Sequence, residues 1–204
     1  FNLTPLFQCD PLGPSLYADV WGDGNYAYMG TIPDSTGVQI FDIAQQTCIP
    51  GVSYAVYENV MRIDPATGNP IKASFLDIQV QNGVGYFGSG YLVSGESDGV
   101  HIVNVSKPMN PTLITKINSK THPGAYDNVH NLFIDSCILY VVDMVSNAII
   151  VYDVGVNSTP QQPKYLCDII TSGYSVHDIT VRTDRLYASM LTGNTDIYDV
   201  SSVR

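Results

Sequence analysis

The sequence predicts an all-β protein, a β-propeller of four-stranded antiparallel blades, and three observations lead to this prediction. One block recurs four times in the 204 residues, and a repeat of about 40–50 residues with several strands per unit is typical of propeller blades. Among the 19 acidic residues only Glu58 and Glu96 are Glu, and Asp favours turns where Glu favours helices. The chain is rich in Tyr, with 14 residues, as strands are. We therefore expect four blades in a single domain over residues 1–204.

Each block opens with Asp or Asn, reaches a Tyr nine residues later, and closes with a short apolar run that ends in Asp or Asn and a β-branched residue. We expect the opening residue to lie in the innermost strand, the Tyr in the second and the closing run in the third. The alternation of apolar and polar residues suits strands that pack on a neighbouring blade. The opening residues are Asp19, Asp77, Asn131 and Asp178, and the tyrosines are Tyr28, Tyr86, Tyr140 and Tyr187.

Turn residues separate the predicted strands within each block. Asn82-Gly83 lies between two strand-like runs of the second block, and Asn-Gly is the strongest short-range hairpin signal. The third and fourth blocks turn at residues 135–137 and 182–185. The hairpins between the second and third strands are expected at residues 33–37, 94–99, 146–147 and 192–195.

An outer strand is expected after each third strand. Residues 110–117 and 162–169 fit this role, and residues 54–63 fit it less well inside an insertion at residues 45–74. The fourth block is not followed by such a strand, but residues 4–10 match the pattern of residues 162–169 in their Pro, aromatic, Cys and Asp positions. We expect residues 4–10 to complete the last blade and to close a four-bladed ring, which removes exposed strand edges. The alternative is that the four blades belong to a larger ring.

Charge and composition restrict the classes of partner. The net charge is −10 and the nine basic residues are scattered, which argues against nucleic acid and anionic membranes. No apolar run is long enough to cross a bilayer. Three glycosylation sequons, at Asn2, Asn104 and Asn157, and an even number of Cys favour an extracellular protein, secreted or at the cell surface. The alternative is a cytosolic protein with four buried thiols.

The four cysteines suggest two disulfides. Cys137 and Cys167 belong to the same block, so they are expected to join, and Cys9 would then pair with Cys48 and tie the N-terminal strand to the insertion. Four cysteines allow three connectivities, and free buried thiols are the alternative.

The opening residues are the candidate site, because the innermost strand of a propeller lines the central channel. His130 and His177 directly precede two of them, and strand alternation predicts that each His points away from the residue that follows it. The functional interpretation is a calcium or transition-metal site, or a ligand site, at the channel mouth. The structural interpretation is a polar network that accepts backbone N–H groups and joins the blades. His101 and His122 are expected at the surface or between blades.

Several runs resemble the LVIVD repeat: LYVVD at residues 139–143, IIVYDV at 149–154 and GVHIVNVSKPMNP at 99–111. The order of the segments at residues 19–22, 77–80, 129–131 and 176–178 also resembles bacterial surface proteins called choice-of-anchor B. The resemblance implies an extracellular or surface-attached β-propeller, without a defined biochemical role. No anchor segment is visible in this sequence, so it does not itself indicate surface attachment.

Two functions follow from these observations. The first is a non-catalytic binding or structural module of an extracellular assembly, whose partner is an extracellular protein, a glycan or copies of the chain itself. The second is a metal-dependent, hydrolase-like propeller enzyme with Asp19, Asp77, His130 and His177 at the channel mouth. No His-Glu-x-x-His motif occurs in the sequence, and no catalytic residue is assigned.

Overall fold

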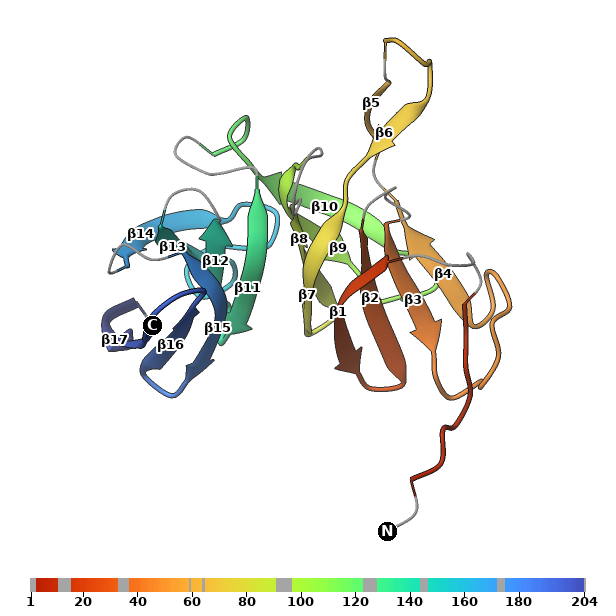
Figure 1. Cartoon of the computed structure of the whole chain (residues 1–204), viewed down its shortest axis with the longest axis horizontal. Helices are drawn as coiled ribbons and strands as arrows, with labels where there is room; N and C mark the ends of the chain where they lie inside the picture. The colour runs from red at the N-terminus through yellow and green to blue at the C-terminus, as the bar shows by residue number, and fades with distance from the viewer. Residues whose placement is uncertain are drawn as a thin grey trace.

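The protein is an arc of antiparallel β-sheets (Figure 1). The computed structural model describes residues 3–10, 16–32, 37–58, 60–63, 65–90, 97–122, 128–143, 147–171 and 175–203. Within these ranges the only helix is a short 3-10 turn, Ser201–Val203. The described residues form no helix with the length and hydropathy needed to cross a membrane.

Among the described residues three blades have four strands and the fourth has three, and each blade pairs its strands in chain order. Blade 1 is β1 (Leu16–Asp23), β2 (Tyr26–Ile32), β3 (Val38–Asp42) and β4 (Tyr54–Tyr57). Blade 2 is β7 (Phe75–Gln81), β8 (Val84–Ser89), β9 (Gly99–Asn104) and β10 (Thr112–Ile117). Blade 3 is β11 (Val129–Asp135), β12 (Ile138–Asp143), β13 (Ala148–Asp153) and β14 (Lys164–Ile170). Blade 4 is β15 (Val176–Arg182), β16 (Arg185–Met190) and β17 (Thr195–Asp199).

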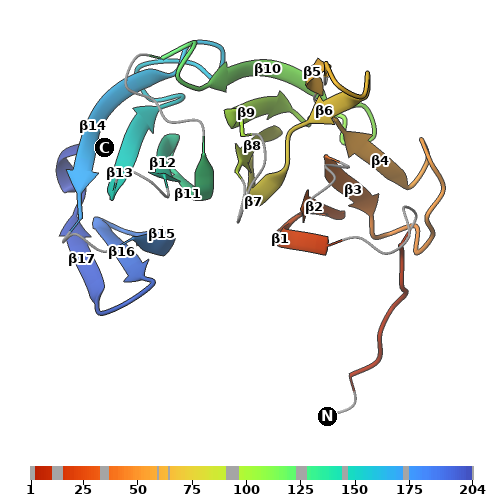
Figure 2. The ribbon, with the colours of Figure 1, turned by 45° about the horizontal axis from the view of Figure 1, so that its top comes forward.

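The first strand of every blade lies on the inside of the arc, and blades 1 and 4 form its two separate ends (Figure 2). Neighbouring inner strands contact one another in the order β1, β7, β11, β15. The prediction of an all-β propeller with four antiparallel blades is confirmed, with β17 as the last strand of blade 4 in the described part of the chain.

The tight turns between first and second strands follow from residues that tolerate positive φ. Asn82 and Gly83 have φ of 53° and 75°, as a two-residue type I′ hairpin requires. Ser136 and Cys137 adopt φ of 51° and 66° in the same turn of blade 3. The predicted hairpin at residues 192–195 joins β16 to β17. Those expected at 33–37, 94–99 and 146–147 lie partly outside the described residues.

The insertion at residues 45–74 contains two elements. β4 is the outer strand of blade 1 and pairs with β3, which confirms an outer strand at the start of residues 54–63. The strand ends at Tyr57, earlier than predicted, and β5 (Val60–Ile63) pairs instead with β6 (Pro70–Lys72). This second hairpin stands out from the arc between blades 1 and 2 (Figure 1).

The core is divided into three clusters, one in each junction between neighbouring blades. In each junction the tyrosine of the repeated block is buried against the next blade, together with the central residue of the third strand. The register places the two side by side, because each tyrosine pairs directly with its third-strand partner. The pairs are Tyr28 with Ile40, Tyr86 with Ile102, and Tyr140 with Val151.

The N-terminal segment does not complete blade 4. Residues 3–10 form no strand, so the predicted outer strand at 4–10 is wrong in this structure. A disulfide between Cys9 and Cys48, with Cα atoms 5.9 Å apart, ties the segment to blade 1 instead. The Tyr17 hydroxyl also donates to Asp10 Oδ1 at 2.7 Å. The predicted pairing of Cys9 with Cys48 is confirmed, and this tether holds the segment at the opposite end of the arc from blade 4 (Figure 2).

The predicted disulfide between Cys137 and Cys167 is wrong, because both thiols are free. The two cysteines serve different junctions of blade 3. The Cys137 backbone N–H donates to Gln81 Oε1 of blade 2 at 3.3 Å. Cys167 packs in the cluster between blades 3 and 4. They belong to one block, but proximity in sequence did not place them on the same side of the sheet.

Candidate functional site

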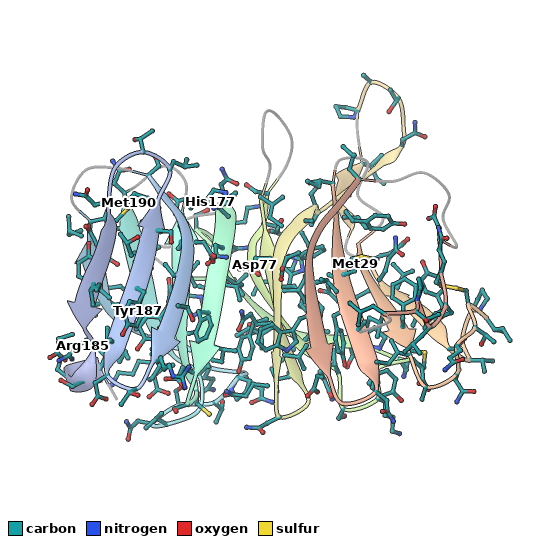
Figure 3. The ribbon with its side chains drawn as sticks, turned by 60° about the horizontal axis from the view of Figure 1, so that its bottom comes forward. Met29, Asp77, His177, Arg185, Tyr187 and Met190 are labelled. Atoms are coloured by element: carbon teal, nitrogen blue, oxygen red, sulfur yellow. A yellow bond between two sulfur atoms is a disulfide. The ribbon has the colours of Figure 1, made fainter. Side chains whose placement is uncertain are left out.

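A hollow of about 300 Å³ lies at the inner strands and is lined by residues of all four blades. All six residues of the predicted channel ring line it, so the structure brings them together. Asp77 and His177 are labelled on their inner strands in Figure 3. The lining comprises Ala18, Asp19, Ile32, Leu76, Asp77, His130, Asn131, His177 and Asp178.

A β-bulge explains why neighbouring residues both reach this hollow. In blade 3 the pairing passes from Val129 with Asp143 to Asn131 with Val142, which leaves His130 unpaired. The same shift leaves His177 unpaired in blade 4 and Leu76 in blade 2. A bulge inserts one extra residue and interrupts alternation. The regular alternation on which the predicted opposite directions of each His and its successor rested is thus interrupted, and both residues line the same hollow.

The opening residues of the first three blades hydrogen-bond to the next blade. Each accepts from the backbone N–H of the residue that follows the next blade's opening residue. The three bonds use side-chain oxygens, so they join blades that no backbone ladder connects. They run from Ile78 N to Asp19 Oδ2 at 3.4 Å, from Leu132 N to Asp77 Oδ2 at 2.6 Å, and from Ile179 N to Asn131 Oδ1 at 3.0 Å.

Asp77 is the most buried member of this set, with 3% of its surface exposed. Both carboxylate oxygens accept backbone hydrogen bonds, since Oδ1 also receives the Ile78 N–H at 2.7 Å. Burial raises the pKa of Asp77, and the neighbouring Asp19 carboxylate raises it further, against the lowering effect of the two N–H donors. This environment is that of a structural acceptor between blades.

Two glutamines extend the junction between blades 2 and 3. Gln79 Oε1 accepts from Ile134 N at 3.5 Å, and Gln81 Oε1 accepts from Cys137 N at 3.3 Å. Together with Asp77 they form a row of acceptors at every second residue of β7. The sequence analysis did not identify the glutamines, although polar residues at every second position of the inner strand β7 indicate such a row of acceptors.

Asp178 is the fourth opening residue and differs from the others. It is exposed, and its side chain makes no hydrogen bond within the described part of the chain. The face of β15 that would meet a following blade has none beside it in this structure (Figure 2).

His130 and His177 lie close together in the hollow. Their ring centroids are 5.0 Å apart with an interplanar angle of 65°. His130 Nδ1 is buried and has no hydrogen-bond partner among the described residues. Burial lowers the pKa of His130, His177 lowers it further, and Asp178 opposes these effects. A neutral His130 ring is therefore favoured.

A metal site requires several ligands close together. Among the residues that the structure describes, no three His, Cys, Asp or Glu side chains group closely enough to hold a metal. The adjacent imidazoles provide two nitrogen ligands, whereas zinc sites in proteins take three or four protein ligands.

A buried polar network in blade 2 was not anticipated. The Tyr57 hydroxyl lies 2.9 Å from His101 Nδ1, and His101 Nε2 lies 3.2 Å from Asp98 Oδ2. Lys116 Nζ also pairs with Asp98, and Asn118 Nδ2 donates to it at 3.0 Å. These contacts lower the pKa of Asp98 despite its partial burial, while burial lowers the pKa of His101.

The positions of His101 and His122 refine the prediction made for them. His101 is fully buried, and it contacts Tyr57 of blade 1 from blade 2, so the alternative of a position between blades is the correct one. His122 is half-buried, and its Nε2 lies 3.3 Å from the carbonyl oxygen of Pro163, directly before the outer strand β14 of blade 3.

Two of the three sequons are described. Asn104 and Asn157 are exposed, so both side chains are sterically open to a glycosyltransferase. Asn104 Oδ1 accepts from Ser106 N at 3.0 Å in an Asx turn. Asn2 lies outside the described residues.

Comparisons with known proteins support the fold. No protein-family model matches the chain, and no curated protein sequence matches it significantly. The computationally designed Ika4 protein aligns with 98% of this chain and 100% of its own length, with a TM-score of 0.66 and 11% identity. The computationally designed Ika8 protein aligns with 92% of this chain at a TM-score of 0.61 and 10% identity.

The chain spans about half the length of the Ika8 protein, 47% of it. A third structure, the extracellular domain of a protein described as a one-component system from B. thetaiotaomicron, aligns over 28% of its own length with a TM-score of 0.45 and 11% identity. At these identities the likeness to the designed proteins concerns the fold alone.

Proposed function

We propose that this chain is a non-catalytic binding or structural module of an extracellular assembly, and that it meets its partner through the ends of the arc. The observation that carries the proposal is the exposed side of blade 4. We define the terminal face of blade 4 as Asp178, Thr180, Arg182, Arg185, Tyr187, Ser189, Thr195, Ile197 and Asp199, which share one side of the sheet by register.

Apolar residues at the centre of this terminal face are exposed although their counterparts form the core. Tyr187 is 36% exposed and Ile197 is 61% exposed, and the two pair directly across β16 and β17. In blade 3 the equivalent Tyr140 and Val151 are both 0% exposed. Exposed apolar surface with a polar rim is typical of interaction sites. Tyr187 and Arg185 are labelled on blade 4 in Figure 3.

The channel residues favour a non-catalytic role over an enzyme. Asp19, Asp77 and Asn131 are engaged with backbone N–H groups of the next blade. Groups that hold the fold in this way are not free to exchange protons with a substrate or to complete a metal site. This is the structural interpretation of the ring.

Three observations favour an extracellular setting. The disulfide between Cys9 and Cys48 suits an oxidising compartment. The sequons at Asn104 and Asn157 are exposed. The repeat resembles the LVIVD and choice-of-anchor B pattern, whose proteins lie at the bacterial surface. We propose an extracellular protein, a glycan or another copy of the chain as the partner.

Hydroxyl-radical footprinting of the protein in its native extracellular setting and as a purified chain tests this proposal. We expect Tyr187 and Ile197 to react less in the native setting, while Leu113, an exposed residue of the outer strand β10, reacts equally in both. Equal reactivity of Tyr187 and Ile197 in the two states would contradict an assembly through this face.

A second function, that of a metal-dependent enzyme, is favoured by one observation, the His130–His177 pair in the hollow. Titration with Zn²⁺, followed by calorimetry and by the NMR signals of the imidazole rings, tests it. Binding of one ion that is lost in His177→Ala would support the enzyme. Absence of binding to the intact chain would exclude a zinc site at this position.

A further inference from the structure

We propose that the terminal face of blade 4 binds the exposed side of blade 1 of a second copy of this chain, so that two arcs close into one ring with two identical junctions. This inference rests on the proposed function and names its partner. The three junctions within one chain show the contacts that such a junction would repeat.

Blade 1 presents the surface that matches the terminal face of blade 4. We define the receiving face of blade 1 as Val20, Gly22, Ala27, Met29, Phe41 and Ile43, of which Phe41 is buried in the single chain. Val20 follows the opening residue Asp19, and it is 60% exposed. Its equivalents in the other blades, Ile78, Leu132 and Ile179, are buried against the preceding blade.

The terminal face of blade 4 carries a side-chain acceptor without a bond, and the receiving face of blade 1 carries the matching backbone donor position. In every junction of the chain, an opening residue accepts from the N–H of the residue one place after the next opening residue. Asp178 is an opening residue whose side chain makes no hydrogen bond among the described residues, and the backbone N–H of Val20 holds the donor position. A junction between Asp178 and the second copy's Val20 therefore continues the established series.

Charge also fits this junction. Arg182 occupies the position of Gln81, which contacts the first turn of the following blade at Cys137. The equivalent turn of blade 1, Gly24-Asn25, directly follows Asp23 at the end of β1, and both Arg182 and Asp23 are exposed. Arg182 on the face of blade 4 thus meets Asp23 of blade 1, and these opposite charges favour contact between the two faces.

The N-terminal segment acquires a role in the same junction. Phe7 and Cys9 line a hollow beside Ala27, Met29 and Phe41 of the receiving face. The terminal blade has three strands, and the outer edge of β17 has no strand beside it in the described part of the chain. The segment forms no strand in one chain, and its disulfide to Cys48 holds it at the end of the arc that would face the second copy's blade 4.

A second copy is the occupant because one chain carries both halves of the junction. A contact between two different faces generates a ring if the rotation closes, and an open filament if it does not. Both ends of the arc open toward the same side (Figure 2), as closure around a two-fold axis requires. The likeness to 47% of the Ika8 chain shows that this arrangement of blades also occurs as about half of a longer chain.

Sedimentation velocity on the purified 204-residue chain tests the proposal. We expect a species of about 44 kDa, twice the 22.2 kDa of one chain. Tyr187→Lys and Ile197→Lys are expected to give the 22 kDa monomer, because both place a charge in an apolar contact. Their far-UV circular dichroism is expected to stay unchanged, since both side chains are exposed in one chain.

Matched variants separate the junction from general surface effects. Asp178→Ala is expected to weaken dimerisation about tenfold through loss of a charge-assisted hydrogen bond. Asp178→Asn is expected to keep it, because Asn131 makes the same bond in blade 3. Leu113→Lys, on an outer strand, is expected to remain dimeric.

Two results would overturn the proposal: a wild-type chain that is monomeric at micromolar concentration, or a dimer that persists in Tyr187→Lys. A monomer whose Tyr187 is nevertheless protected in the native extracellular setting would leave the proposed function standing with a different partner. Larger open oligomers would show the same contact without closure, and they would overturn the ring.

Discussion

At the scale of single residues, the same position serves different purposes in different blades. Asp77 is buried and accepts two backbone N–H groups, while Asp178 is exposed and accepts none among the described residues. The repeat in the sequence identified these positions and their place in the channel. It did not identify the bulge that turns His130 and His177 into the same hollow, because no residue type marks a bulge of this kind.

Asp77→Ala is expected to lower the free energy of unfolding by about 2–3 kcal/mol, since it leaves the buried N–H of Leu132 without its side-chain acceptor and Ile78 N–H with only the longer bond to Asp19. Asp178→Ala is the matched control and is expected to change stability by less than about 0.5 kcal/mol. Urea unfolding of both variants, at dilutions at which the chain is monomeric, makes the comparison. Equal losses in the two variants would refute the structural role assigned to Asp77.

At the scale of strands and hairpins, the sequence predicted most of what is observed. The Asn82-Gly83 turn, the outer strands β10 and β14, and β4 follow from local turn chemistry and alternation. The N-terminal segment was not predictable in the same way. Its match to the outer strand of blade 3 indicated strand character, but the disulfide to Cys48 decides which blade it lies beside.

The network around His101 predicts a dependence of stability on pH. Burial lowers the pKa of His101 and of His130 in the folded state, so the unfolded chain takes up protons first, near its ordinary pKa of about 6.5. The free energy of unfolding is therefore expected to fall as the pH drops below about 6.5. Urea unfolding between neutral and mildly acidic pH measures this slope.

His101→Gln is expected to reduce the slope, and His130→Gln to reduce it further when the two are combined. A slope that is the same in wild type and double variant would contradict the assignment of this acid sensitivity to the two buried rings.

At the scale of the whole molecule, the sequence predicted the blades and their order, but it left open whether the blades close into a ring. The repeated block indicates only what the blades have in common. Closure depends on the contacts of blades 1 and 4, which differ from the rest, and Tyr187 has the same identity as the buried tyrosines although it is exposed.

The disulfide between Cys9 and Cys48 is expected to stabilise the chain by about 3–4 kcal/mol, because it closes a loop with a sequence separation of 39 residues. The Cys9→Ala/Cys48→Ala double variant, unfolded in urea beside the wild type, measures this contribution. Thiol labelling of the unfolded wild type without reductant is expected to modify Cys137 and Cys167. Labelling at Cys9 would contradict the assigned pairing.

Because the strand contacts between blades link each blade to its neighbours in sequence, the molecule is close to a one-dimensional chain of coupled units. Blades 2 and 3 each have two neighbours, and an end blade of the free monomer has one. Amide hydrogen exchange in the monomer is therefore expected to be slowest in β8 and β12 and fastest in β16 and β17, as blade 4 opens without the others. Uniform protection across the four blades would show a single cooperative unit instead. If protection instead decreases from blades 2 and 3 toward blade 4, the ends of the arc open most easily. Joining these ends to another arc would then slow amide hydrogen exchange throughout the protein.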